Sequence, residues 1–153
     1  MKYIILLLLL FSNPVIAKND YLNLWEEEKM ARDIYSMMSR KYDVKIFYNI
    51  KSAEDRHMMN VESLFKEYNI PIPVYRNQIG VFNIQKYKDL YASLISKGNL
   101  SLRDALDVGI MIEESDIKDL EEMIKNAESE NENNILHSLR SGSLNHLDAF
   151  QRQ

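Results

Sequence analysis

Cysteine is absent from the 153 residues of this sequence. The chain therefore has no disulfide framework, and it cannot hold a metal through thiolates as rubredoxins and iron–sulfur proteins do. A lipid-modified cysteine is excluded for the same reason. Whatever chemistry the protein performs must come from other side chains.

Glycine, proline and clustered positive charge are also scarce. Only four glycines and three prolines are present, and no stretch alternates apolar and polar residues clearly enough to predict a sheet. An all-α protein is the fold class that this composition favours. The net charge is −4, and lysine and arginine form no stripe, which argues against nucleic acid as a main partner.

One apolar run stands at the start of the chain. Ile4–Phe11 follows the basic Lys2 and precedes Val15-Ile16-Ala17, where cleavage would occur. This pattern is typical of a secretory signal peptide. A membrane span needs roughly 20 apolar residues, so an uncleaved anchor is the weaker interpretation. We therefore expect a signal peptide over residues 1–17, and an exported domain of residues 18–153 that reaches the periplasm or the cell exterior without a membrane segment.

Apolar residues recur at three- and four-residue spacing in the remaining chain, as on the buried face of a helix. This spacing predicts long helices over about 21–42, 47–68 and 101–125, and a fourth after the polar stretch 126–134. Ser101 and Asp104 resemble a capping box at the start of the third.

The second and third long helices are separated by a long connection. Pro71, Pro73 and Gly80 exclude a regular helix over 69–83, and a short helix over about 84–97 ends at Gly98. The sequence therefore predicts one domain, a four-helix bundle whose long crossover carries a short extra helix.

Each of the four apolar stripes is interrupted by side chains that can bind a metal ion. They are Glu28, the pair Glu54 and His57, the pair Glu113 and Asp116, and His146. Residues three apart lie on one helix face, and inward carboxylates without partners are costly to bury. Two divalent cations would remove this cost. The mixed oxygen and nitrogen donors suit iron or manganese, with zinc as a third candidate.

Neighbouring polar residues compete for these roles. Glu113 is preferred to Glu114, which points about 100° away around the helix, and Glu26 and Glu27 are expected at the surface. His137 falls off its stripe and should face solvent. Asp116 is equally well interpreted as a ligand, as an acceptor behind the ligands or as a surface acid.

Tyr35 lies on the same stripe as Glu28. It is either a donor to a carboxylate ligand or an ordinary core tyrosine.

These residues also carry a family resemblance. The stretch from Glu28 to Tyr35, EKMARDIY, resembles the first-helix motif of rubrerythrin-type ferritin-like proteins, Glu54-x-x-His57 matches their second-helix motif, and Glu113-x-x-Asp116 is similar to their third-helix acidic pair. Together, EEEKMARDIY, IEESDIKDL and GSLNHLDAF resemble a ferritin-like family catalogued as domain of unknown function 2202. This resemblance covers Leu24 to Phe150 and implies a four-helix bundle with a dimetal carboxylate site.

The fourth helix departs from the ferritin-like pattern. It has Ser143-x-x-His146 where that pattern has Glu-x-x-His. The missing carboxylate could be replaced by Glu114, Asp116, Asp148 or a water, or one metal position could stay incomplete. Gly142 beside it predicts a bend or break, because glycine inside a helix costs about 1 kcal/mol.

Two functions follow from these observations. The first is an exported ferritin-like protein whose di-iron or di-manganese centre reacts with oxygen or peroxide, with Tyr35 and Asp116 tuning ligands or protons. The alternative is a non-catalytic helical metal-binding or protein-interaction module with an incomplete site, which Ser143 favours. A homodimer is a candidate assembly for either function.

Overall fold

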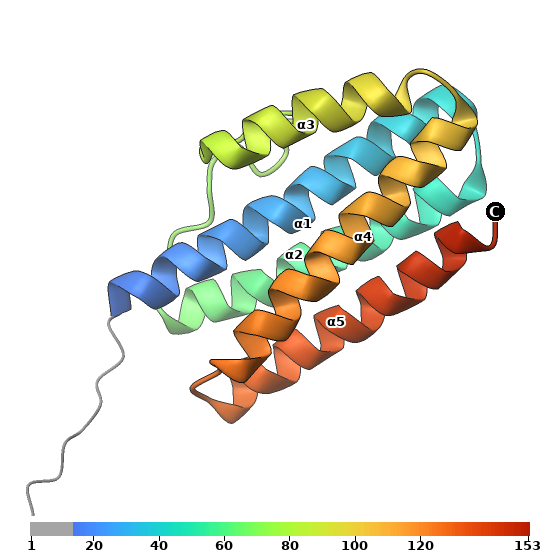
Figure 1. Ribbon diagram of the computed structural model, residues 1–153. Helices are drawn as coiled ribbons and strands as arrows, with labels where there is room; N and C mark the ends of the chain where they lie inside the picture. Colours follow the sequence, from blue (N-terminus) through green and yellow to red (C-terminus); the bar gives the residue numbers. More distant parts are fainter. Residues whose placement is uncertain (1–13) are drawn as a thin grey trace, which may run out of the picture.

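A computed structural model describes residues 14–153 and confirms the all-α fold class. Within these residues the chain forms five α-helices and no strand (Figure 1). The helices are α1 (Pro14–Tyr42), α2 (Lys45–Glu67), α3 (Gln85–Gly98), α4 (Leu102–Lys125) and α5 (Glu130–Gln151). Only α3 is short, with 14 residues.

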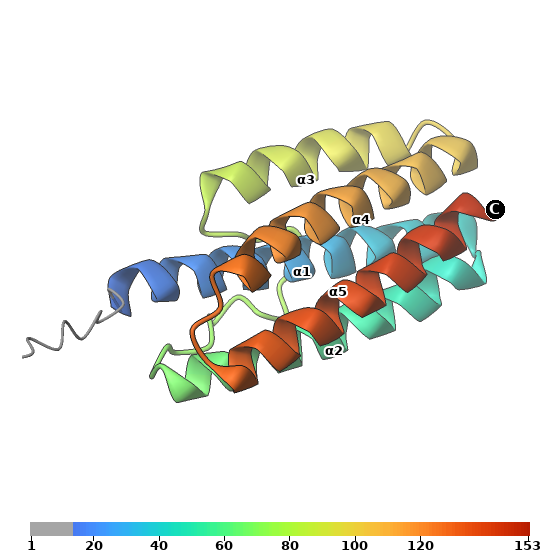
Figure 2. The same ribbon diagram turned by 60° about the horizontal axis from the view of Figure 1, so that its bottom comes forward.

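The helices form two antiparallel hairpins that pack side by side. α1 pairs with α2 and α4 pairs with α5, while further contacts join α1 to α4 and α2 to α5 (Figures 1 and 2). The crossover after α2 returns along the bundle, and α3 lies outside it against α1 and α4. None of the helices in the described residues is both long and apolar enough to cross a membrane.

The helix boundaries follow the sequence prediction except at two ends. α1 begins at Pro14 and so includes the last residues of the predicted signal peptide, whereas residues 1–13 lie outside the described part of the chain. The signal peptide itself stays a prediction. α5 begins inside the polar stretch, because Ser129 Oγ accepts a hydrogen bond from the Glu132 N–H, and the Glu132 carboxylate accepts one from the Glu128 N–H.

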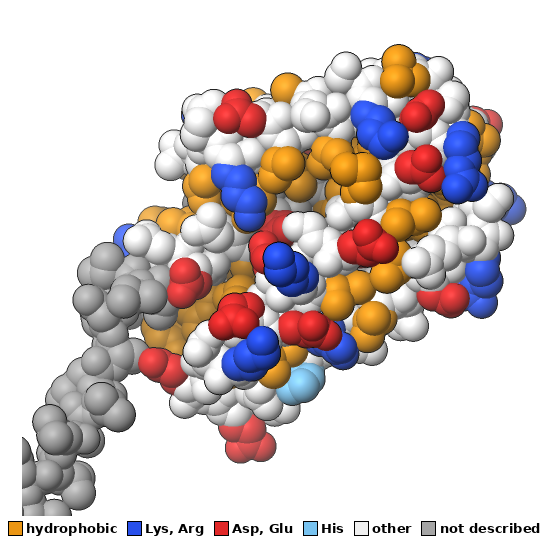
Figure 3. Space-filling model, viewed as in Figure 1, with side chains coloured by type: hydrophobic (Ala, Val, Ile, Leu, Met, Phe, Trp, Pro, Cys, Tyr) orange, Lys and Arg blue, Asp and Glu red, His pale blue; other side chains and the backbone are white. Residues whose placement is uncertain are grey.

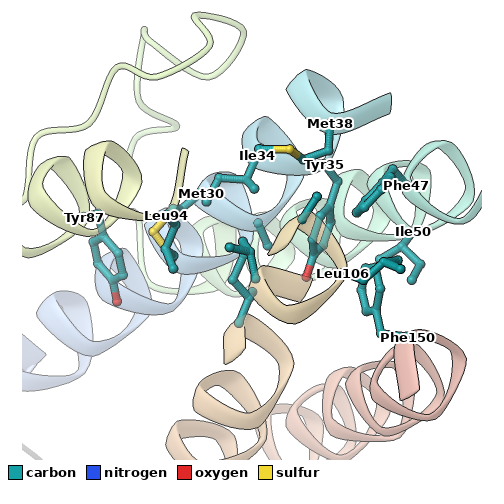
Figure 4. Close-up of a cluster of buried hydrophobic side chains, with 14 of the residues drawn as sticks. Met30, Ile34, Tyr35, Met38, Phe47, Ile50, Tyr87, Leu94, Leu106 and Phe150 are labelled. Carbon is teal, nitrogen blue, oxygen red and sulfur yellow. The ribbon is translucent and has the colours of Figure 1, made fainter. Parts of the chain in front are cut away.

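Two apolar clusters form the core, one toward each end of the bundle. The Phe47 cluster includes Tyr35, Phe47 and Phe150, whose rings lie side by side (Figure 4). The Trp25 cluster includes Trp25 and Phe65 at the other end. Every long helix supplies residues to both clusters, so the polar positions that interrupt the stripes lie between two apolar layers.

The crossover is attached to α1 by buried charged side chains. Glu26 is only 1% exposed, and its carboxylate accepts hydrogen bonds from Tyr75 Oη at 2.6 Å and from the Asn83 and Ile84 N–H groups at the start of α3. The prediction that Glu26 lies at the surface is therefore wrong. Its carboxylate replaces the side-chain cap that Ile84 cannot supply.

A second attachment is centred on Asp33, which is fully buried. Its carboxylate lies 2.6 Å from Lys29 Nζ and 2.8 Å from an Arg32 nitrogen, and it accepts a hydrogen bond from the Gly80 N–H. Gly80 has φ of +75°, which glycine adopts without strain. Lys29 and Arg32 also donate to the carbonyls of Gln78 and Arg76 in the crossover.

We expect Asp33→Ala to destabilise the protein strongly. It would leave Lys29, which is also fully buried, without its carboxylate, and breaking a buried ion pair by removing one partner costs about 3–5 kcal/mol. Urea unfolding measures the change. The control is Asp107→Ala, which removes an exposed pair with Arg103 and should cost less than about 1 kcal/mol. Equal losses in the two variants would contradict the assigned role of Asp33.

Candidate metal centre

The structure brings the five predicted metal ligands together in the middle of the bundle. They form two groups, Glu28 with Glu54 and His57, and Glu54 with Glu113 and His146, and within each group the potential ligand atoms lie within 4.8 Å of one another. Glu54 belongs to both groups. Two metal positions that share one carboxylate could be built from these side chains. The ligand roles themselves stay predictions.

The first group joins α1 to α2. His57 Nδ1 lies 2.8 Å from Glu54 Oε2 and 3.2 Å from Glu28 Oε2. Glu54 and His57 are three residues apart on one helix face, so α2 presents both groups to the same point.

The second group joins α2, α4 and α5. His146 Nδ1 lies 2.9 Å from Glu54 Oε1 and 3.5 Å from Glu113 Oε2. Despite this proximity, the geometry between His146 Nδ1 and Glu54 Oε1 is not that of a hydrogen bond, and both atoms are buried without a partner among the described residues, as are Glu28 Oε1 and Asp116 Oδ1. Atoms placed close together but not hydrogen-bonded are what converging metal ligands require.

Burial sets the protonation of the acidic side chains. It raises the pKa of Glu28 and of Glu113 to about 7, because the charged form loses its hydration. Glu54 behaves in the opposite way. Burial disfavours its charged form too, but the two histidines beside it, His146 and His57, outweigh that effect and lower the pKa of Glu54 to about 2.

The two histidines are charged in the absence of a metal. Burial alone would lower their pKa values, yet Glu28 and Glu54 raise the pKa of His57 to about 11, and Glu113 and Glu54 raise the pKa of His146 to about 9. The imidazolium groups thus compensate part of the negative charge. A metal ion would have to displace their protons, because only a neutral imidazole binds a metal.

Tyr35 contacts the candidate ligand Glu113. Its hydroxyl donates a hydrogen bond of 2.7 Å to Glu113 Oε1, while its ring packs against Phe47 and Phe150 (Figure 4). Burial, with the negative charge of Glu113 next to it, raises the pKa of Tyr35, so the phenol stays a donor. Such a contact fixes the orientation of a carboxylate.

Asp116 and Ser143 face each other across α4 and α5. Ser143 donates a hydrogen bond to Asp116 Oδ2 and lies 3.1 Å from the Leu139 carbonyl oxygen. Asp116 belongs to neither of the two groups described above. The other two acids proposed to replace the missing carboxylate point away from the centre, because Glu114 is exposed and Asp148 is exposed beside Arg152.

The structure explains the glycine at position 142 by packing, which the sequence does not show. α5 is continuous through it, so a break at this position is wrong. A Cβ atom at position 142 would lie 2.4 Å from His57 Nε2, a distance that packed atoms do not adopt. Glycine is required because the imidazole of His57 packs against the backbone of α5.

Glu27 is the other sequence prediction that the structure corrects. It is 5% exposed rather than at the surface, since α3 packs against α1. Burial, with Asp119 near it, raises the pKa of Glu27 to about 8. Glu27 lines a narrow gap with Ala31, Ile112 and four further carboxylates, those of Glu28, Glu54, Glu113 and Asp116. His137 is exposed, as predicted.

The pKa shifts predict how the stability of the metal-free protein depends on pH. A histidine whose pKa folding raises stabilises the folded state below its unfolded pKa of about 6.5, and this contribution is lost as pH rises through the folded pKa, which is about 9 for His146. Glu28 and Glu113 act in the same direction, because their protons are held up to about pH 7 in the folded protein.

With a chelator present, the free energy of unfolding should therefore fall steadily from about pH 5 to about pH 9. Urea unfolding at several pH values measures it. His146→Gln should reduce the slope between about pH 6.5 and pH 9, and the contribution of His57, whose pKa is about 11, should remain. A stability that rises with pH over this range would contradict the assigned protonation states.

Comparisons with known proteins place the chain in a family. Residues 17–153 match the uncharacterized protein domain DUF2202. The uncharacterized protein MJ0754 of Methanocaldococcus jannaschii is 43% identical over 135 residues, which are 88% of this chain and 73% of that protein. A crystal structure of the hypothetical protein MJ0754 from Methanococcus jannaschii DSM 2661 has a TM-score of 0.87 and 42% identity, covering 93% of this chain and 80% of that one. The chain thus belongs to the DUF2202 family.

Proposed function

We propose that the protein is a ferritin-like bundle that holds two iron or manganese ions and reacts with oxygen or peroxide. Zinc is a third candidate for the site, but it has no redox chemistry and would not support this reaction. The observation that carries the proposal is the pair of Glu/His groups that share Glu54. The arrangement of two helix hairpins joined by a crossover along the bundle is compatible with a ferritin-like fold. Oxidation of Fe(II) and reduction of peroxide are the two reactions that such a centre suits.

The residues fit two divalent cations by charge as well as by position. Four buried carboxylates, those of Glu28, Glu54, Glu113 and Asp116, face two imidazoles, those of His57 and His146. With all four carboxylates ionised, two protonated imidazoles would still leave two negative charges without compensation. Two divalent cations and neutral imidazoles would balance all four carboxylates.

The roles of the side chains follow from this placement. Glu28, Glu54 and His57 would hold one ion, and Glu54, Glu113 and His146 the other. Bound iron or manganese would supply one-electron redox chemistry toward oxygen or peroxide. Tyr35 keeps Glu113 in position through its hydroxyl, and the two apolar clusters exclude water from both ends of the centre.

Export is part of the same proposal. The apolar run at the start of the chain supports a route to the periplasm or the cell exterior. On the face shown in Figure 3, acidic and basic side chains are interspersed.

Anaerobic loading with Fe(II) followed by admission of oxygen tests the function. Protein purified from cells that express the full chain should bind close to two irons and consume oxygen as the iron is oxidised. His57→Ala should lose at least one of the two irons, and His137→Ala, which changes the exposed histidine, should behave like the original chain. Failure of the original chain to bind iron or manganese would overturn the proposal.

The second candidate function is a non-catalytic helical module with one metal ion or none. Ser143 is the observation that favours it, because α5 lacks the carboxylate of the ferritin-like pattern. In the same experiment, one bound ion per chain and no consumption of oxygen would support this alternative.

Gly142→Ala should weaken metal binding while the helix is kept. The added methyl group would displace His57, and loss of correct ligand orientation lowers metal affinity by roughly 10- to 100-fold. Titration with Co(II) measures the affinity, and circular dichroism measures the helix content. Ser141→Ala changes an exposed neighbour and is the control. Unchanged affinity in Gly142→Ala would show that the position of His57 is unimportant for binding.

A further inference from the structure

We infer that the turn between α1 and α2 holds a binding site for a phosphate group, either inorganic phosphate or the phosphate of a small organic ester. The site is a hollow of about 400 Å³ at the end of the bundle away from the start of α1 (Figure 1). It shares no residue with the candidate metal centre. The inference is therefore independent of the proposed function.

Positive side chains from both helices line this hollow. Arg40 comes from the last turn of α1, and Lys45 and Lys51 come from the first two turns of α2. None of the three forms an ion pair with a carboxylate of the described residues. Asp43 also lines the hollow, so three positive charges stand beside one negative charge in a protein whose net charge is −4. Cations gathered in this way repel one another, and a bound anion would relieve the repulsion.

The start of α2 faces the same hollow. Val44 precedes the helix and Lys45 is its first residue, and both line the hollow. Val44 makes no side-chain cap, whereas Ser101 and Ser129 cap α4 and α5. The first N–H groups of a helix have no acceptor within it and form the positive end of its dipole. Helix starts of this kind bind phosphate.

A buried serine is an independent sign of a ligand. Ser36 on α1 is 8% exposed and lines the hollow, yet its hydroxyl has no hydrogen-bond partner within residues 14–153. A serine inside a helix can donate to the carbonyl four residues earlier, as Ser52 and Ser143 do. Leaving a buried hydroxyl unpaired is unfavourable. The proton of Ser36 is therefore available to an oxygen of the ligand.

This set of donors suits a phosphate better than a carboxylate. A guanidinium, two ammonium groups, helix N–H groups and a hydroxyl offer more protons than two carboxylate oxygens accept, whereas a phosphate group has three strong acceptor oxygens and a larger negative charge. The hollow has the volume of a small-molecule site, and it is lined by Tyr48, which is 62% exposed. The organic part of a phosphate ester would lie against this ring.

Isothermal calorimetry of the full chain with inorganic phosphate tests the inference, in the presence of a chelator so that phosphate on a metal ion does not contribute. The chain should bind one phosphate. Arg40→Gln should bind it at least about tenfold more weakly, because a charged donor is lost. Lys66→Gln removes an exposed lysine at the other end of α2 and is the matched control, with unchanged affinity.

Asp43→Asn should change the affinity in the opposite direction. It removes the only carboxylate among the described residues that line the hollow, so phosphate should bind more tightly. Asparagine adopts the positive φ of 51° at this position as readily as aspartate does. Ser36→Ala should weaken binding severalfold, and circular dichroism checks that each variant is folded.

Phenyl phosphate distinguishes the two sources of the phosphate group. Binding tighter than that of inorganic phosphate, with the gain lost in Tyr48→Leu, would identify an ester, and equal or weaker binding would identify the free ion. The inference is overturned if the original chain does not bind phosphate. Equal weakening in Arg40→Gln and Lys66→Gln would also overturn it, because the affinity would then reflect overall charge and not this hollow.

Discussion

The constraint on which this structure depends is the burial of four carboxylates between two apolar clusters. Glu28, Glu54, Glu113 and Asp116 are all at least 95% buried, and separating such charges from water costs several kcal/mol each unless they are paired. Two histidines compensate part of this charge in the absence of metal. The bundle can keep this layer because every long helix contributes both to it and to the apolar clusters on either side.

α1 is the helix on which the other elements are assembled. Each of residues 24–36 is buried, so over this length α1 has no solvent-facing side. One side carries Glu28 toward the candidate metal centre, and another carries Glu26, Lys29 and Asp33 toward the crossover and the start of α3. By attaching the crossover, these charged side chains also hold α3 against the side of α1 on which Glu27 lies. The position of the centre and the course of the long connection are linked through one helix.

The residues that could be predicted from sequence are those whose signal is local to one helix. Glu54 and His57 were identifiable from their spacing on an apolar stripe, and burial of Glu113 with exposure of Glu114 follows from the 100° step between neighbouring residues. Glu26, Glu27 and Gly142 were misjudged. The environment of each of these residues is set by another element, namely the crossover, α3 and the imidazole of His57. Helical periodicity carries no information about such contacts with a second layer of packing.

The sequence by itself determined the all-α class, the approximate helix limits and the candidate ligands, because period, capping residues and helix breakers act over a few residues. Only the tertiary structure decided that Glu54 is common to both groups, that Asp116 faces Ser143, and that α1 is enclosed on all sides over residues 24–36. These facts depend on the register between helices. Register is set by how side chains of separate segments fit together, and that fit exists only once the bundle is packed.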